Sequence, residues 1–240
     1  MIADSVAWKD RLRDDLVRLR KRLRSVDKEY DGYDDIELFT FTSAFIIRKL
    51  VDSLRLSIEA EFCKVLATAY PARRVELDDR DILDIARQFR LLNGEHVEVG
   101  LRDLCNELIH SHYFIAACTE RSTHWSLYFA SDANRSKRAL RIPLARFERL
   151  VRFVSDDEWD MQSRRFRGSN DEYGPSHDLK YRPADDGVDA RSKRQHQRSA
   201  EAYFRHLNKL LLGGMNIASA RREAAKTYLV RRHGTIPLLR

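Results

Sequence analysis

The polar residues that could act together chemically lie in one short stretch, residues 102–112. Within it, Asp103, Asn106 and His110 recur at steps of three and four residues, so a helix would present them on one face. Histidine can donate and accept protons near neutral pH, and an amide can orient a phosphate or a ribose hydroxyl. The stretch therefore predicts a candidate site for proton transfer or nucleotide binding.

The helix that carries this face is predicted to begin near Val99, because apolar residues follow at helical spacing. The buried stripe is expected to contain Leu101, Leu104, Leu108 and Ile109. Upstream, a segment from Ile36 to Ala69 is apolar on nearly all sides and ends at Tyr70-Pro71. Such a pattern is typical of the central helix of a bundle. A further helix is predicted near Asp81 to Leu92.

Downstream of the polar stretch, the composition changes to aromatic and small apolar residues. Tyr113 to Thr119, Trp125 to Ala130 and Ala139 to Leu144 are predicted to be short strands of a small antiparallel sheet. A turn is expected over residues 131–137, and helical periodicity returns from Ala145 to Trp159.

The N-terminal residues 4–26 predict an amphipathic helix with a heptad seam of leucines. Two interpretations are open: the seam packs on the protein's own body, or it pairs with a second copy. The many arginines on the other faces are expected to be solvated. The seam residues are Leu12, Leu16, Leu19, Leu23 and Val26.

A long apolar helix followed by a helix with Asn106 and His110 resembles the HEPN superfamily (higher eukaryotes and prokaryotes nucleotide-binding domain). The resemblance covers about residues 35–155. It implies a helical bundle, metal-independent ribonuclease activity in a homodimer, and a role in defence or in a toxin–antitoxin pair. The family motif has an arginine before the polar residue, where this chain has Cys105.

The resemblance implies a catalytic set of Asn106, His110 and Arg102, although seven residues separate Arg102 from His110. RNA cleavage needs positive charge at the phosphorane, which cysteine cannot supply, so Arg102 or Arg135 would have to provide it. Three hypotheses remain open: structural polar residues, a degenerate nucleotide- or RNA-binding face, or an active nuclease.

Other features of this region carry less chemistry. We expect Cys105 to be a buried thiol and His112 and His124 to be strand or loop residues. The segments 105–111 and 129–135 are also similar to a group of uncharacterised bacterial proteins, which implies no activity.

Charge is distributed unevenly along the chain. The net charge is +7, and residues 190–240 contain twelve basic and two acidic residues, so this segment carries +10 and the rest −3. Such asymmetry predicts a polyanion partner. Two helices are predicted, Ser199 to Leu212 and Asn216 to Arg231, around Gly213-Gly214-Met215. The residues predicted to contact nucleic acid are Arg221, Arg222, Lys226, Arg231 and Arg232.

Several classes lack support in the sequence. The three cysteines are widely spaced and form no Cys-x-x-Cys pair, so neither a metal centre nor a disulfide framework is expected, and no motif calls for a cofactor. No apolar run approaches the roughly 20 residues of a membrane span, and no secretory signal is evident. These features predict a cytoplasmic protein without a membrane partner.

The sequence therefore predicts an α+β protein that is mainly α, with a helical bundle, a small antiparallel sheet and a basic helical hairpin. The predicted divisions are a HEPN-like body (residues 1–162), a polar linker (163–198) and the hairpin (199–240). The first functional hypothesis is a HEPN-like nucleic-acid-associated protein with weak or absent ribonuclease activity. The alternative is a non-enzymatic interaction or regulatory protein whose basic tail docks an acidic protein partner.

Overall fold

The computed structural model describes residues 5–24, 32–53, 55–73, 85–118, 124–157, 162–165, 177–180, 202–203, 205–207, 209–233 and 238–239. The chain divides into two compact units. The first comprises residues 1–50, 63–156 and 238–240, and the second comprises residues 51–62 and 157–237. Each unit is described separately below.

An antiparallel sheet forms the centre of the first unit, with strand order β2-β1-β5-β4-β3. Residues alternate along β1 between buried and partly exposed positions, as expected for a strand with one face on a core. A short strand, β8 (Leu238–Leu239), pairs in parallel with the start of β1. The five main strands are β1 (Lys64–Pro71), β2 (Glu95–Gly100), β3 (Ser111–Ala117), β4 (Ser126–Ser131) and β5 (Arg138–Pro143).

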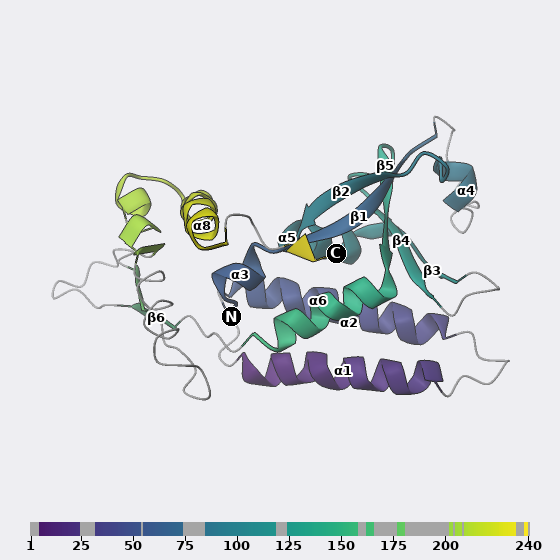
Figure 1. Ribbon diagram of the computed structural model, residues 1–240, viewed down its shortest axis with the longest axis horizontal. Coiled ribbons are helices and arrows are strands. Elements are labelled where there is room, and N and C mark those ends of the chain that lie inside the picture. The colour runs from purple at the N-terminus through teal and green to yellow at the C-terminus, as the bar shows by residue number, and fades with distance from the viewer. Residues whose placement is uncertain are drawn as a thin grey trace. The chain divides into compact units, whose positions relative to one another are not determined.

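Helices cover one face of this sheet. Phe41 of α2 packs on Phe114 of β3 with ring centroids 4.9 Å apart, and Phe39 of α2 meets Phe147 of α6 edge to face at 5.9 Å. Figure 1 shows α2 and α6 beneath the sheet and α1 as the outermost layer. The helices of this unit are α1 (Val6–Arg24), α2 (Tyr33–Asp52), the short α4 (Ile85–Gln88), α5 (Leu101–Ile109) and α6 (Leu144–Ser155). The predicted α+β fold class, mainly α with an antiparallel sheet, is confirmed.

The leucine seam of α1 packs within the chain, against α6. Leu12, Leu16 and Leu19 are 0%, 5% and 3% exposed, and Arg20 forms an ion pair with Glu148 of α6 at 2.7 Å. The interpretation that this seam packs on the body is therefore confirmed. Val26 lies outside the described residues.

The predicted long helix from Ile36 to Ala69 is wrong in its second half. Helix α2 ends at Asp52, a short helix α3 (Ile58–Glu61) follows, and residues 64–71 form β1. Val65, Ala67 and Ala69 share the buried face of β1, whose backbone pairs with β2 and β5. A short apolar run is compatible with helix or strand, and here strand pairing decides the outcome.

Two further predicted boundaries need correction. Within the described residues the helix predicted near residues 81–92 is limited to α4, and Leu92 lies in a turn. Residues 95–100 form β2, which had not been predicted although Val97 and Val99 alternate with polar residues. Helix α6 ends at Ser155 rather than Trp159.

The second unit contains α3, helical residues between 202 and 212, and α8 (Ile217–His233). Gly214 adopts φ +84° in the turn between the last two, a conformation that favours glycine. We call the helical residues 202–212 with α8 the C-terminal hairpin. Its buried face forms one apolar cluster with Ile58 of α3. The hairpin residues of this cluster are Tyr203, Leu207, Ala220, Ala224, Ala225 and Tyr228.

The segment predicted as a polar linker, residues 163–198, is described only in part. Two short strands, β6 (Gln162–Arg165) and β7 (His177–Lys180), pair antiparallel there, and the rest of the segment lies outside the described residues. The hairpin buries its apolar stripe partly against α3, far earlier in the sequence, so its core is not made by residues 199–240 alone.

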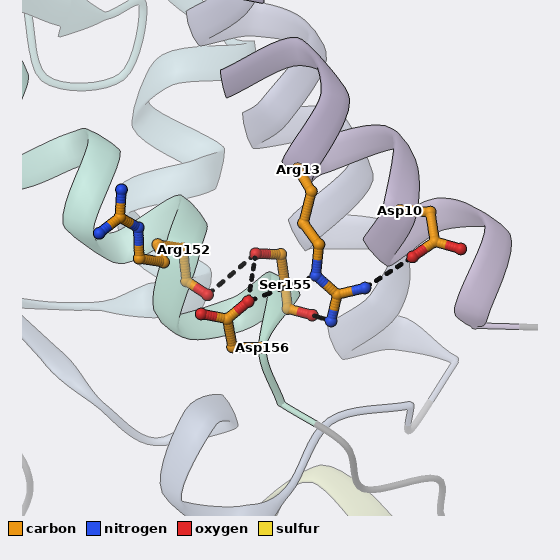
Figure 2. Close-up of polar contacts among 5 residues, drawn as sticks. All are labelled: Asp10, Arg13, Arg152, Ser155 and Asp156. Carbon is orange, nitrogen blue, oxygen red and sulfur yellow. Dashed lines mark hydrogen bonds and ion pairs between the residues drawn. The ribbon is translucent and has the colours of Figure 1, made fainter. Parts of the chain in front are cut away.

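Arg13 of α1 holds the C-terminal end of α6 (Figure 2). Its Nη2 donates to the main-chain oxygen of Ser155, its Nε to Asp156 at 3.3 Å, and its Nη1 to Asp10 at 2.6 Å. The last carbonyls of a helix lack partners within the helix and carry partial negative charge. A guanidinium at this position therefore satisfies a carbonyl and complements the helix dipole.

We expect Arg13→Ala to lower the free energy of unfolding by about 1 kcal/mol, since it removes this cap and its charge. Urea denaturation followed by circular dichroism measures the change. Arg11→Ala is the matched control: Arg11 pairs within α1 with Asp15, which Arg18 also contacts, so its loss should cost less than about 0.5 kcal/mol. Equal effects of the two variants would contradict the capping role.

Candidate functional site

Helix α5 has one buried and one polar face. Leu101, Leu104, Cys105 and Leu108 are buried at helical spacing, and the main-chain N–H of Leu101 donates to the carbonyl of Cys63 at the start of the helix. Because the apolar side is fixed against the sheet, the opposite side faces outward. The polar residues singled out from the sequence lie on that side.

A cleft of about 620 Å³ runs along the polar face of α5. Asp103, Asn106 and His110 all line it, so the structure brings these three predicted residues together. Arg102, the third member of the predicted catalytic set, is not among its lining residues. The lining comprises Glu98, Val99, Gly100, Asp103, Asn106, Glu107, His110, Ser131, Asp132, Ala133, Asn134 and Arg138.

An arginine that had not been predicted contacts Asn106. The Nε of Arg48, on α2, donates to Oδ1 of Asn106 at 2.8 Å. Burial lowers the pKa of Arg48, and the neighbouring charge of Arg102 lowers it further, whereas Cys105 raises it. Arg48 thus supplies a guanidinium next to the motif, but one that holds the asparagine in place. The sequence did contain a signal, since Arg48 interrupts the apolar run around it.

Cys105 occupies the position where the family motif has arginine. Its side chain is 0% exposed, and burial raises the pKa of its thiol, as does the nearby Cys63. A buried thiol of raised pKa remains protonated and is a poor nucleophile. The prediction that Cys105 is a buried thiol is confirmed.

The turn after β4 forms the opposite wall of the cleft. Glu107 accepts from the main-chain N–H of Ser131 at 3.3 Å and from Nδ2 of Asn134. These bonds fix the turn against α5. The carboxylate of Glu107, one of those that line the cleft, therefore already accepts hydrogen bonds that hold the turn in place.

A second set of contacts fixes the same turn from β3. Arg135 lies 2.7 Å from Nε2 of His112, and Nδ1 of that ring lies 3.2 Å from Asp132. Because arginine can only donate, Nε2 accepts and the proton is assigned to Nδ1. His112 is a strand residue, as predicted, and His124 lies in the loop before β4.

The charge of the cleft opposes phosphate binding. Its lining contains the carboxylates of Asp103, Glu107 and Asp132 against one guanidinium, Arg138. The carboxylate of Glu98, which also lines the cleft, pairs with Lys64 at 2.7 Å. A phosphorane carries negative charge, which such a lining repels. Within the described residues no group of three or more His, Cys, Asp or Glu side chains is arranged to hold a metal ion, so no metal site is identified there.

In the C-terminal hairpin the predicted nucleic-acid residues separate into different environments. Arg221 is 5% exposed and forms an ion pair with Glu61 of α3, so the expectation that it reaches a phosphate needs correction. The cause is its position on the arc of α8 that also buries Ala220 and Ala224. Arg222 and Lys226 are exposed. Arg231 and Arg232 lie in the last turn of α8, and their side chains lie outside the described part.

Tyr203 lies next to this ion pair in the hairpin core. Burial raises its pKa to about 12, and the charge of Glu61 also raises it, whereas Arg221 lowers it. The phenol therefore stays neutral through the physiological range. Tyr228, whose ring lies 5.8 Å from that of Tyr203, donates to Glu59 at 3.1 Å. Two carboxylates of α3 thus anchor the hairpin.

No family model, curated protein or solved structure was found to match this chain. The resemblance to the HEPN superfamily thus stays a prediction, which now depends on the spacing of Asn106 and His110 because the long helix is shorter than expected. No described helix is both long and apolar enough to cross a membrane.

We expect Arg221→Ala to lower the free energy of unfolding of the second unit by about 3 kcal/mol, because it leaves Glu61 buried without its cation. Chemical denaturation monitored by tyrosine fluorescence measures this. Arg222→Ala, which removes the same charge from the exposed side of α8, should change it by less than about 0.5 kcal/mol. Similar values for both would show that Arg221 is not buried in solution.

We expect His110→Ala to leave any cleavage of labelled RNA unchanged. Arg138 is the one arginine among the residues that line the cleft, and the carboxylates there outnumber it, so the lining does not stabilise the negative charge of a phosphorane. Gel analysis of timed reactions provides the measurement, and circular dichroism establishes folding. A loss of about tenfold or more, equal to about 1.4 kcal/mol in the barrier, in a folded variant would restore the nuclease hypothesis.

Proposed function

We propose that the protein is a nucleic-acid-associated binding protein with weak or absent catalysis, which holds nucleic acid by neutralising phosphates with the C-terminal hairpin. The observation that carries the proposal is the division of α8 into two sides. Ala220, Ala224 and Tyr228 are buried, whereas Arg222 and Lys226 are exposed. Since the apolar side is fixed in the cluster, the cations on the other side must face solvent.

The first helix of the hairpin adds to this charge. Arg205 and Lys209 are both exposed and lie four residues apart, so they occupy neighbouring positions on one helical face. Lys226 pairs with Glu223 at 3.2 Å with both side chains at least half exposed, a contact that competes weakly with a phosphate. Lysines and arginines arranged in this way bind through counterion release and do not read bases.

The charge of the α5 cleft argues against catalysis on a phosphate there. It brings Asn106 and His110 together, but its carboxylates outnumber its guanidinium, and Arg48 is engaged with Asn106. A substrate phosphate would enter against repulsion. The proposal therefore assigns no RNA cleavage to this cleft.

The second candidate function, docking of a protein partner, is favoured by one observation at the tip of the hairpin. Leu212 is 89% exposed and Met215 is 37% exposed, on either side of the glycine turn. Exposed apolar side chains flanked by cations suit an acidic partner that also presents apolar residues. Such binding would survive salt better than contacts with phosphate.

We expect Arg222→Ala with Lys226→Ala to weaken binding to duplex and single-stranded oligonucleotides of any sequence. Four exposed cations, one phosphate each, predict a slope of log K against log salt of about −4 on duplex DNA, and the double variant should flatten it by about two units. Fluorescence anisotropy at several salt concentrations measures both. The matched control, Lys21→Ala with Arg24→Ala, removes two exposed cations from α1 and should leave the slope unchanged.

If neither ligand binds at low salt, where attraction is greatest, the nucleic-acid proposal fails. Equal loss in the α1 control would show that binding depends on net charge and not on the hairpin. Binding of a protein that persists at high salt and disappears in Leu212→Ser would favour the second candidate instead.

A further inference from the structure

Helix α2 has an exposed apolar face as well as a buried one. Its inner side is fixed in the core, where Ile36, Ile47 and Leu50 are 0% exposed. On the outer side Leu38 is 68% exposed and Phe45 is 47% exposed. Isolated apolar residues are common on protein surfaces, but apolar residues that gather on one face mark an interaction site.

The outward-facing residues of α2 form one row along the helix. Steps of three and four residues place side chains on the same helical face, and the row follows these steps over about 22 Å at 1.5 Å per residue. All of its members are exposed or partly exposed. We call this row the outer α2 face, and it consists of Asp34, Leu38, Phe41, Thr42, Phe45 and Lys49.

Two contacts fix the outer α2 face against the edge of the sheet. Strand β3 is the last strand in the sheet order, and its Phe114 packs on Phe41 with ring centroids 4.9 Å apart. The hydroxyl of Tyr33, at the start of α2, donates to the main-chain oxygen of Phe114 at 3.1 Å. Phe114 is itself partly exposed, so it extends the apolar surface of the row. A surface that is ordered before binding loses less conformational entropy on association.

The two ends of the row carry opposite charges. Asp34 lies in the first turn of α2 and Lys49 in the last, and both are exposed. Nζ of Lys49 lies 5.3 Å from the centroid of the Phe45 ring, which holds this cation on the outer α2 face. The row is therefore acidic at one end, apolar in the middle and basic at the other end.

Such a row is complementary to itself when a second copy lies antiparallel to it. Asp34 of each copy then lies opposite Lys49 of the other copy. The same register places Leu38 opposite Phe45, since both pairs are centred on the midpoint of the row. A twofold axis through that midpoint makes each contact twice. A parallel arrangement would instead bring like charges together, which is unfavourable.

We propose that the outer α2 face binds a second copy of this chain, in a twofold-symmetric dimer whose α2 helices lie antiparallel. A partner of one charge would suit only one end of the row, whereas a second copy suits both ends and the apolar middle. The inference goes beyond the proposed nucleic-acid binding and does not rest on it, because the C-terminal hairpin and the outer α2 face share no residue.

Sedimentation equilibrium of the full chain at several protein concentrations tests the dimer. Leu38→Ser with Phe45→Ser should raise its dissociation constant about tenfold or more, because each apolar contact is lost twice. The matched control, Val6→Ser with Val17→Ser, removes side chains of α1 that are 59% and 67% exposed and should leave the constant unchanged. A monomeric wild type would overturn the inference, and so would equal effects of the two double variants.

Charge reversal tests the antiparallel register in the same experiment. Asp34→Lys and Lys49→Glu should each weaken self-association, because each places like charges opposite one another in both contacts. An equal mixture of the two variants should restore association, since each copy then meets the opposite charge at both ends. Weakening without recovery in the mixture would contradict the register. Both positions are exposed, so these variants also serve if the double apolar variant does not fold.

Cysteine crosslinking gives a readout that leaves the apolar and charged contacts intact. Thr42 lies next to the twofold axis and meets its own copy, so Thr42→Cys should yield a disulfide-linked dimer on mild oxidation. The background is Cys118→Ser, because Cys118 is exposed whereas Cys63 and Cys105 are buried. Val17→Cys in this background should stay monomeric. Crosslinking of both cysteine variants to the same extent would show random collision and overturn the inference.

Discussion

The pairing of β1 on both of its edges is the constraint on which the first unit depends. Antiparallel bonds join β1 to β2 on one side and to β5 on the other, and β8 pairs with its first residues. Since side chains alternate along a strand, this register places Val65 and Ala67 on the core face and Leu66 and Thr68 on the opposite one. A slip of one residue would exchange the two faces. The helices and the α5 cleft would both lose their positions.

The same register separates charge. On one side of the sheet, α5 and the turn after β4 gather carboxylates around Asn106 and His110. On the other side, the guanidinium of Arg141 lies over the ring of Tyr128. The two residues that fit the nuclease motif therefore lie in a cleft whose negative charge repels phosphate.

Local patterns in the sequence predicted most of the elements that carry these features. The stripe of Leu101, Leu104 and Leu108 located α5 to within two residues, and the aromatic runs located β3 and β4. The helix predicted through Ala69 failed because Val65 to Ala69 is too short and too apolar for its period to distinguish strand from helix.

Contacts between distant parts of the chain could not be predicted in the same way. Arg48 meets Asn106 across 58 residues and Arg221 meets Glu61 across 160. Neither pair has a spacing that local periodicity can detect. The polar face of α5 was therefore predictable, but the arginine behind it was not. Likewise the basic tail was evident, but which of its arginines is buried depended on a helix far upstream.

The distance in sequence between α3 and α8 also has a consequence during synthesis. Ile58 and Glu61 emerge from the ribosome long before Ala220, Arg221 and Tyr228 exist. At ordinary elongation rates, the 160 residues between Glu61 and Arg221 take about 8 to 32 s to make. During that interval the apolar side of α3 lacks the residues that bury it in the folded protein. We therefore expect chaperones to bind most strongly to nascent chains that end before residue 220.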